Sequence, residues 1–344
     1  MTVCSLDPLV DPRWRDFVVR HADASVFHTP AWLRALQRTY DYEPIVFTTS
    51  APAEELRSAL VFANVRSWLS GQRLVSLAFS DHCEPLVENA EELSVLCRFV
   101  QDIRSRERWK YVEIRTANSA LRLDGDFRQA GSFYLHRLDL RPSVETLLGS
   151  FHKDIRQKIR RAQREGLTYE AGRSEALLQK LYGLLRLTRR RHHLPPQPLA
   201  WFRNLVDCFR EGACIRIASS GGRPVAGILT LSHGKRVIYK YAGSDARLNT
   251  LGGMAWLVWQ TIREAKDAGA EELDLGRSDC DNAGLIAFKE RWAASRSTLT
   301  NWRCPASTPT LIEGWRIQFA KQIFARLPDG MLTAAGKLFY RHIG

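Results

Sequence analysis

The sequence predicts an α/β protein built from two copies of one mixed unit. Its 344 residues, 45% of them apolar, are enough for two domains with ordinary cores. Apolar runs of strand length alternate with helix-period segments in both halves. The halves also share a pattern: Phe79-Ser80-Asp81, a helix and a strand at 111–115 parallel Gly243-Ser244-Asp245, a helix and a strand at 272–275. This repeat predicts a duplication.

In the first half, Pro30 marks the first turn of a helix, and polar residues after Ala78 end a strand. The spacing predicts helices at 30–39 and 91–106. The predicted strands are 45–48, 56–65, 74–78, 111–115 and 133–140.

The second half begins near Ser143. Its predicted helices are 144–164, 175–191, 199–209, 253–266 and 283–292. Its predicted strands are 214–218, 225–232, 237–241, 272–275 and 297–302. The tail, 311–343, has the pattern of two amphipathic helices separated by Leu327-Pro328-Asp329-Gly330. We therefore expect units at 1–141 and 142–306, followed by C-terminal amphipathic helices at 307–344.

The formal charge of +13 favours anionic partners, which include phosphates, nucleic acid and an acidic membrane surface, without choosing among them. The seven cysteines are odd in number and form no CxxC pair, so we expect neither a disulfide framework nor a zinc cluster, and a reducing cytoplasm. No apolar run reaches the roughly 20 residues that a spanning helix needs. The basic amphipathic tail suits either contact with an anionic bilayer or docking on the protein body.

An unusual lysine lies in the predicted helix 283–292. At about 100° per residue, Lys289 falls on the apolar face formed by Leu285, Phe288 and Trp292. A lysine there snorkels to solvent, pairs with an acid or serves a site. Snorkelling is the ordinary interpretation of such a residue, and a functional site is the alternative.

Polar and glycine residues follow the predicted strand 237–241. Tyr241 and Ser244 are typical either of an ordinary strand end or of a ligand site. Arg247, Gly252 and Gly253 precede a long helix, and glycines at a helix N-terminus can cradle phosphate.

Two other patterns have a structural and a functional interpretation. Arg156 belongs to a basic helix face that is either solvated or phosphate-binding, and Arg191 ends a helix, where a cation is favourable in itself. Asp81 is typical of a turn or cap, or of an acid that orients an amine. His192 and His193 have no companion ligand set, so no metal site is expected.

The order of FSDHCEP, KDIRQKIRRAQREG, PVAGILTLSHG, YKYAGSD and IAFKERW resembles the tandem FemAB-type branch of the GNAT acyltransferases, which includes BioF2-like and CelD-like proteins. The resemblance covers roughly residues 15–305. It implies two tandem GNAT-like units with mixed central sheets, plus C-terminal helices.

The resemblance also implies roles for single residues. Phe288-Lys289 matches a Phe-Lys pair beside the reacting acyl group, where Lys289 would stabilise an oxyanion. Asp81 matches an acidic position that lines the acceptor cleft. The remaining implied substrate-binding residues are Tyr241 and Ser244 in the donor cleft, Trp32 in the early cleft segment, and Arg191 and Arg156 on substrate phosphate.

Two departures limit what the resemblance implies. Arg247, Gly252 and Gly253 do not have the R/Q-x-x-G-x-G/A spacing of coenzyme A binding, so the donor stays open between acyl-CoA and aminoacyl-tRNA. A phosphate-binding lysine of peptidoglycan-bridge enzymes is replaced here by Leu36, which weakens the case for a UDP-muramyl peptide acceptor.

Together with these patterns, the resemblance implies an N-acyltransferase or aminoacyltransferase without metal or permanent cofactor. Its acceptor would be an amine of a cell-envelope or polysaccharide precursor or of a small metabolite, with a phosphate-bearing or lipid-linked acceptor expected. The alternative is an acyl-CoA-dependent accessory protein of exopolysaccharide or cellulose biosynthesis, catalytic or not. A third class, a nucleic-acid binder, rests on charge alone. The expected location is the cytoplasm. Peripheral contact at the inner membrane face and a tRNA partner are both left open. DNA is not expected as a partner.

Overall fold

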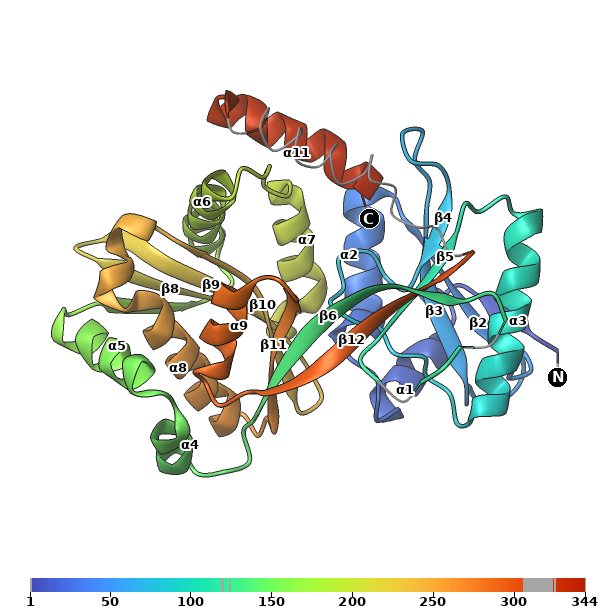
Figure 1. The fold of residues 1–344 in the computed structure, drawn as a ribbon, viewed down its shortest axis with the longest axis horizontal. Coiled ribbons are helices and arrows are strands. Elements are labelled where there is room, and N and C mark those ends of the chain that lie inside the picture. Colours follow the sequence, from blue (N-terminus) through green and yellow to red (C-terminus); the bar gives the residue numbers. More distant parts are fainter. Residues whose placement is uncertain (1, 119–120, 124, 306–323, 325, 344) are drawn as a thin grey trace. The chain divides into compact units, whose positions relative to one another are not determined.

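The chain divides into two compact units in the computed structural model, which describes residues 2–343 except 119–120, 124, 306–323 and 325 (Figure 1). Unit 1 comprises Met1–Tyr134, Ser297–Glu313 and Leu338–Gly344, and unit 2 comprises Leu135–Arg296 and Gly314–Lys337. The division near residue 134 lies close to the predicted boundary at 141. The segment that begins at Ser297 was expected in the second unit, but it belongs to unit 1 because its strand pairs there.

Unit 1 is a mixed sheet covered by helices. Its strands are hydrogen-bonded in the order β1 (Cys4–Leu6), β2 (Glu43–Thr48), β3 (Ala59–Val65), β4 (Arg73–Val75), β5 (Val112–Thr116) and β12 (Ser295–Cys304), of which β12 enters the unit at Ser297. Its helices are α1 (Pro12–Arg20), η1 (Val26–His28), α2 (Pro30–Tyr40) and α3 (Ala90–Arg106). Among these described strands, β4 and β5 pair in parallel, and the pairs β1–β2, β2–β3, β3–β4 and β5–β12 are antiparallel. The sequence patterns missed β1 and α1.

Unit 2 repeats this architecture. Its strands follow the order β6 (Arg128–Asp139, in this unit from Leu135), β11 (Glu272–Asp279), β10 (Arg236–Ser244), β9 (Arg223–His233), β8 (Ala213–Ser220) and β7 (Thr168–Gly172). Its helices are α4 (Val144–Ser150), α5 (Lys153–Arg164), α6 (Glu175–Arg191), α7 (Leu199–Phe209), η2 (Arg210–Gly212), η3 (Ala246–Leu251), α8 (Gly253–Asp267) and α9 (Ala283–Glu290). The predicted α/β class with mixed sheets is confirmed, although β7 was not predicted.

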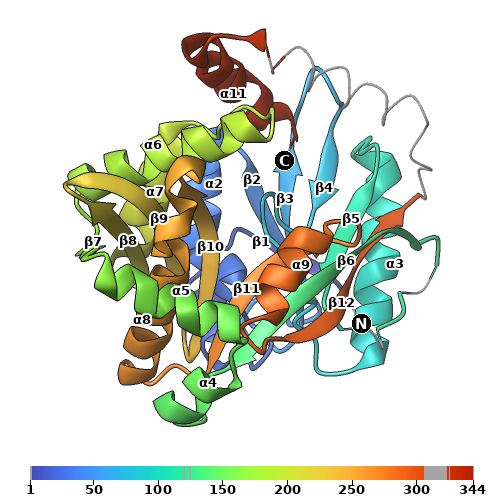
Figure 2. The ribbon, with the colours of Figure 1, turned by 60° about the vertical axis from the view of Figure 1, so that its left-hand side comes forward.

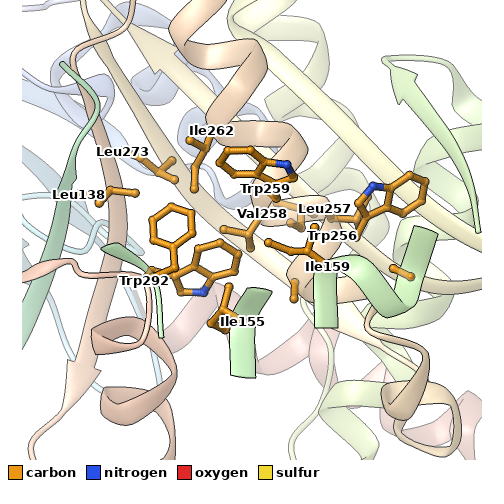
Figure 3. Packing of buried hydrophobic residues seen from close by; sticks show 14 of the residues in the cluster. Leu138, Ile155, Ile159, Trp256, Leu257, Val258, Trp259, Ile262, Leu273 and Trp292 are labelled. Carbon is orange, nitrogen blue, oxygen red and sulfur yellow. The ribbon is translucent and has the colours of Figure 1, made fainter. Parts of the chain in front are cut away.

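Helices cover both faces of the unit 2 sheet. Helices α6 and α7 lie on one face, and α5 and α8 lie on the other (Figures 1 and 2). On the α8 face, the fully buried Trp292 packs with Trp259, Ile155 and Leu138 (Figure 3). Because Trp292 lies two residues beyond the end of α9 at Glu290, this core fixes the helix that carries Lys289.

The single helix predicted at 144–164 is wrong. The chain forms α4 and α5 instead, separated by Phe151, which has extended backbone. Burial of Phe151 in the core turns the chain, and the His152 side chain then caps α5 by accepting from the backbone N–H of Asp154. The helical period continues across this break, so the sequence pattern alone did not reveal it.

The C-terminal helix α11 (Asp329–Ile343) docks its last turn on unit 1. The Tyr42 hydroxyl contacts the carbonyl oxygens of Tyr340 and Arg341 at 3.1 and 3.0 Å, and Arg73 donates to the His342 carbonyl at 2.9 Å. The rest of the predicted tail falls largely outside the described residues. No helix within the described part of the chain is both long and apolar enough to cross a bilayer.

Candidate functional site

Strands β10 and β11 separate after a short paired stretch. They pair in parallel only from Arg236 with Glu272 to Ile238 with Asp274, although β10 runs on to Ser244 and β11 to Asp279. Strand β10 keeps its pairing with β9, with a bulge between Tyr239 and Tyr241. The diverging ends therefore present main-chain polar groups that do not bond each other, and such groups need other partners.

Lys289 projects from α9 onto the diverging part of β11. Its side chain is 2% exposed, and its ammonium donates to the carbonyl oxygens of Gly276 at 2.6 Å and Arg277 at 2.9 Å. A buried ammonium is tolerated only where hydrogen bonds replace its water. The alternative of a lysine that snorkels into solvent is therefore wrong. Phe288, the preceding residue, packs partly buried against the core.

His136 on β6 interacts electrostatically with Lys289, and the sequence patterns did not single it out. Its side chain is fully buried, and neither ring nitrogen has a hydrogen-bond partner within the described residues. Its Nε2 lies 4.0 Å from Glu290 Oε1. Burial lowers the pKa of His136, and the positive charge of Lys289 lowers it further, so this imidazole is neutral at pH 7. The only sign of its burial in the sequence is its spacing of two residues from Leu138, which places both side chains on the same face of a strand.

Tyr241 and Ser244, predicted to line the donor site, are fixed by helices of unit 2. The Tyr241 hydroxyl accepts from Trp201 Nε1 at 2.8 Å, which anchors it to α7. The Ser244 N–H donates to Thr188 Oγ1 at 3.0 Å, which anchors it to α6. Both side chains are partly exposed, so both remain candidates for ligand contact.

The three residues predicted to bind the donor have structural roles in this unit. Arg247 donates to both carboxylate oxygens of Asp245, at 3.0 and 2.8 Å, and lowers the pKa of that carboxyl to about 2. Gly252 has a φ of +80°, and a Cβ there would lie 2.3 Å from the Lys158 carbonyl oxygen. A Cβ on Gly253 would lie 2.8 Å from Val225. Donor binding by these residues stays a prediction.

The predicted phosphate-binding arginines lie on two helices. Arg191 is the exposed last residue of α6, and Arg156 on α5 donates weakly to the Gly149 carbonyl at 3.4 Å. Beside α5 lies a groove of about 1030 Å³. It is lined by Asp154, Gln157, Lys158, Arg160, Arg161, Gln163, Arg164 and Thr250. This basic groove therefore adjoins Arg156 in sequence but does not include it.

Asp81 and Trp32 belong to unit 1. Trp32 is fully buried, with its ring 4.9 Å from that of Phe27, so in this structure it offers no surface to a ligand. Asp81 is half-buried in residues 76–84, which we call the Asp81 loop. Leu77 and Phe79 in this loop have φ values of 32° and 60°. Non-glycine residues in this region are strained, and such strain clusters at functional sites.

A buried carboxylate, Glu113, lies beneath the Asp81 loop in β5. Burial raises the pKa of Glu113, but the charges and hydrogen bonds of Arg115 and Arg303 outweigh it and leave the pKa below its usual value. The Glu113 oxygens accept from Arg115 Nε at 2.7 Å and Arg303 Nε at 2.5 Å. The carboxylate therefore stays ionised in the folded protein at neutral pH.

The substitution Glu113→Gln is expected to lower the free energy of unfolding by about 1.5–3 kcal/mol at pH 7, the scale of hydrogen bonds to charged groups. The folded pKa lies below the unfolded one, so this stabilisation is full above about pH 4.5 and disappears as the pH falls through the folded value. Urea unfolding at several pH values measures the difference. The exposed Glu91→Gln is the control, and a difference that persists unchanged in acid would contradict the expectation.

Residues 149–290, which include the diverging strands and Lys289, match a family model described as an acetyltransferase (GNAT) domain. This range lies inside unit 2. The matched range includes β10, α8, β11 and α9, so the Lys289 end of the site described above lies inside it.

A curated relative of this chain is the UDP-N-acetylmuramoylpentapeptide-lysine N(6)-alanyltransferase of Weissella viridescens. It is 25% identical over 151 residues, which are 43% of this chain and 45% of the relative. The aligned part of the chain thus spans less than half the length of this relative.

Three solved structures share the fold. FemX aligns with a TM-score of 0.67 and 15% identity over 94% of this chain and 100% of its own. L-PGS from Bacillus licheniformis aligns with a TM-score of 0.58 and 15% identity, over 92% of this chain and 98% of its own. A tandem GNAT protein from the clavulanic acid biosynthesis pathway aligns with a TM-score of 0.54 and 11% identity, over 89% of this chain and 99% of its own. The predicted resemblance to FemAB-type tandem GNAT proteins is confirmed, while the BioF2-like assignment stays a prediction.

Proposed function

We propose that this protein transfers an activated acyl or aminoacyl group to an amine of a cell-envelope precursor. The observation that carries the proposal is the buried ammonium of Lys289, which lies on the diverging end of β11 in a GNAT domain. An amine that attacks an ester or thioester creates a negative oxygen in the transition state. A fixed cation in a water-poor site stabilises that charge more than it stabilises the neutral substrate.

The acceptor amine attacks the acyl carbonyl carbon, a C–N bond forms, and the carbonyl electrons move to the oxygen beside Lys289. The oxyanion then collapses, the C–O or C–S bond to the leaving group breaks, and the proton lost by the amine is returned to that leaving group. Asp81 is proposed to hold or deprotonate the acceptor amine, and Arg191 and Arg156 to bind substrate phosphate.

The proposed acceptor is supported by the relative named above, an alanyltransferase whose name gives the lysine of UDP-N-acetylmuramoylpentapeptide as acceptor. We propose the same class of acceptor, a phosphate-bearing or lipid-linked peptidoglycan precursor. The donor stays open between aminoacyl-tRNA and acyl-CoA. The accessory role in exopolysaccharide synthesis has no support among the relatives described here.

A transfer assay tests the proposal directly. The protein is incubated with UDP-N-acetylmuramoylpentapeptide and either alanyl-tRNA or acetyl-CoA, and mass spectrometry follows the precursor. We expect acylation of the lysine amine with one donor, and loss of this product with Asp81→Asn through a higher KM for the precursor. An unmodified precursor with both donors, under conditions where the protein is folded, would refute the proposed acceptor.

A further inference from the structure

The Asp81 loop has a strained backbone. Leu77 and Phe79 both have positive φ values, and neither is glycine. Such a conformation costs free energy and persists only where neighbouring contacts determine it. The loop therefore needs contacts that hold it, and those contacts control where Asp81 lies.

Packing supplies part of this support. Leu77 is fully buried. The Phe79 ring lies 4.9 Å from that of Tyr40 and 5.9 Å from that of Tyr340. These apolar contacts fix the side chains, but they do not fix the carbonyl and N–H groups of the strained turn.

Arg115 bonds the backbone of the loop on both sides of Asp81. Its Nη1 donates to the carbonyl oxygens of Leu77 at 3.0 Å and Ser80 at 3.3 Å. Its own N–H donates to Ser76 Oγ at 2.8 Å, and its carbonyl accepts from the Cys83 N–H at 2.8 Å. One residue of β5 thus contacts four residues of the loop.

Ion pairs with Glu113 fix the guanidinium of Arg115 in turn. Glu113 accepts from Arg115 and also from Arg303 of β12, and the Arg303 guanidinium lies 4.5 Å from the centre of the Tyr111 ring. The planar fork of arginine binds the carboxylate and the loop carbonyls at once. A lysine keeps the charge but has no second nitrogen to do both.

We propose that Arg115 is a positioning residue that holds the Asp81 loop in its strained conformation and so orients Asp81 toward the acceptor amine. The proposal rests on the proposed function for the role of Asp81. The holding of the loop is a property of unit 1 alone, and it can be measured without any substrate.

Hydrogen exchange of the full-length protein tests the first part. Arg115→Lys is expected to raise exchange of the amides of residues 76–84 by about tenfold, while amides of β2 and β3 stay protected. Arg216→Lys is the matched control, because the Arg216 side chain is 8% exposed against 13% for Arg115 and is also paired with a carboxylate, Glu264, but lies in unit 2. Unchanged exchange of the loop in Arg115→Lys would overturn the proposal.

A double-mutant cycle with UDP-N-acetylmuramoylpentapeptide as acceptor tests the second part. Arg115→Lys is expected to lower kcat/KM by about 10–100-fold, mainly through KM, because small misplacements of a substrate-binding group have effects of that size. The double variant with Asp81→Asn should be no worse than Asp81→Asn alone. Additive losses would overturn the proposal. If the wild type transfers nothing, the proposed function fails, and the exchange experiment still decides whether Arg115 holds the loop.

Discussion

Replacing Lys289 by alanine is expected to reduce turnover by about 10²–10³-fold, the cost of losing one oxyanion donor. The ammonium is buried and bonded to the Gly276 and Arg277 carbonyls, so it is held in place before substrate binds. Preorganised charge of this kind acts on the transition state, so the loss should fall on kcat. Single-turnover kinetics with the donor that supports transfer measures it.

Lys266→Ala controls for the structural part of this loss. Lys266 on α8 also donates to two main-chain carbonyls, those of Leu140 and Pro142, but lies outside the proposed site. We expect Lys266→Ala to lower stability to a similar extent while turnover stays near that of the wild type. Equal turnover losses in both variants, or near-wild-type turnover in Lys289→Ala, would remove Lys289 from the mechanism.

Gly252→Ala is expected to lower the free energy of unfolding by about 2–4 kcal/mol, the sum of a strained φ and an overpacked contact. The φ of +80° disfavours any side chain, and the new Cβ would lie 2.3 Å from the Lys158 carbonyl oxygen. Helix α5 would have to move away from the start of α8. Urea unfolding measures the loss.

Gly234→Ala separates the two causes. Gly234 has a φ of +54°, but a Cβ there has no heavy atom within 4 Å, so only backbone strain remains. We expect it to cost about 1–2 kcal/mol. Equal losses in the two variants would show that close packing of α5 on Gly252 is unimportant. A raised KM for acetyl-CoA in Gly252→Ala would favour the predicted role of this glycine in donor binding.

Local patterns in the sequence predicted much of unit 2. The bounds of α6 and α7 agree with the predicted helices, because each has a clear helical period between capping or proline residues. The 100° spacing placed Lys289 on the apolar face of α9, and the structure shows the side chain buried there. The chemical role of Lys289 came from the family resemblance and stays a prediction.

What the sequence could not predict depends on contacts between distant residues. Strand β12 joins unit 1 because it pairs with β5, and Arg303 lies 190 residues from Glu113, the acid it contacts. Hydrophobic periodicity within a short segment carries no information about such a long-range pair. His136 was missed for the same reason: a histidine in a strand is ordinary until α9 covers it. The strained φ values of Leu77 and Phe79 likewise have no glycine to signal them.

The early parting of β10 from β11 bears on how such proteins diversify. The opening is built from main-chain groups, which every amino acid carries and no substitution except proline removes. Side chains around the opening can therefore change while the opening itself persists. An identity of 15% to FemX across nearly the whole length, with the fold kept, is the expected signature of that tolerance.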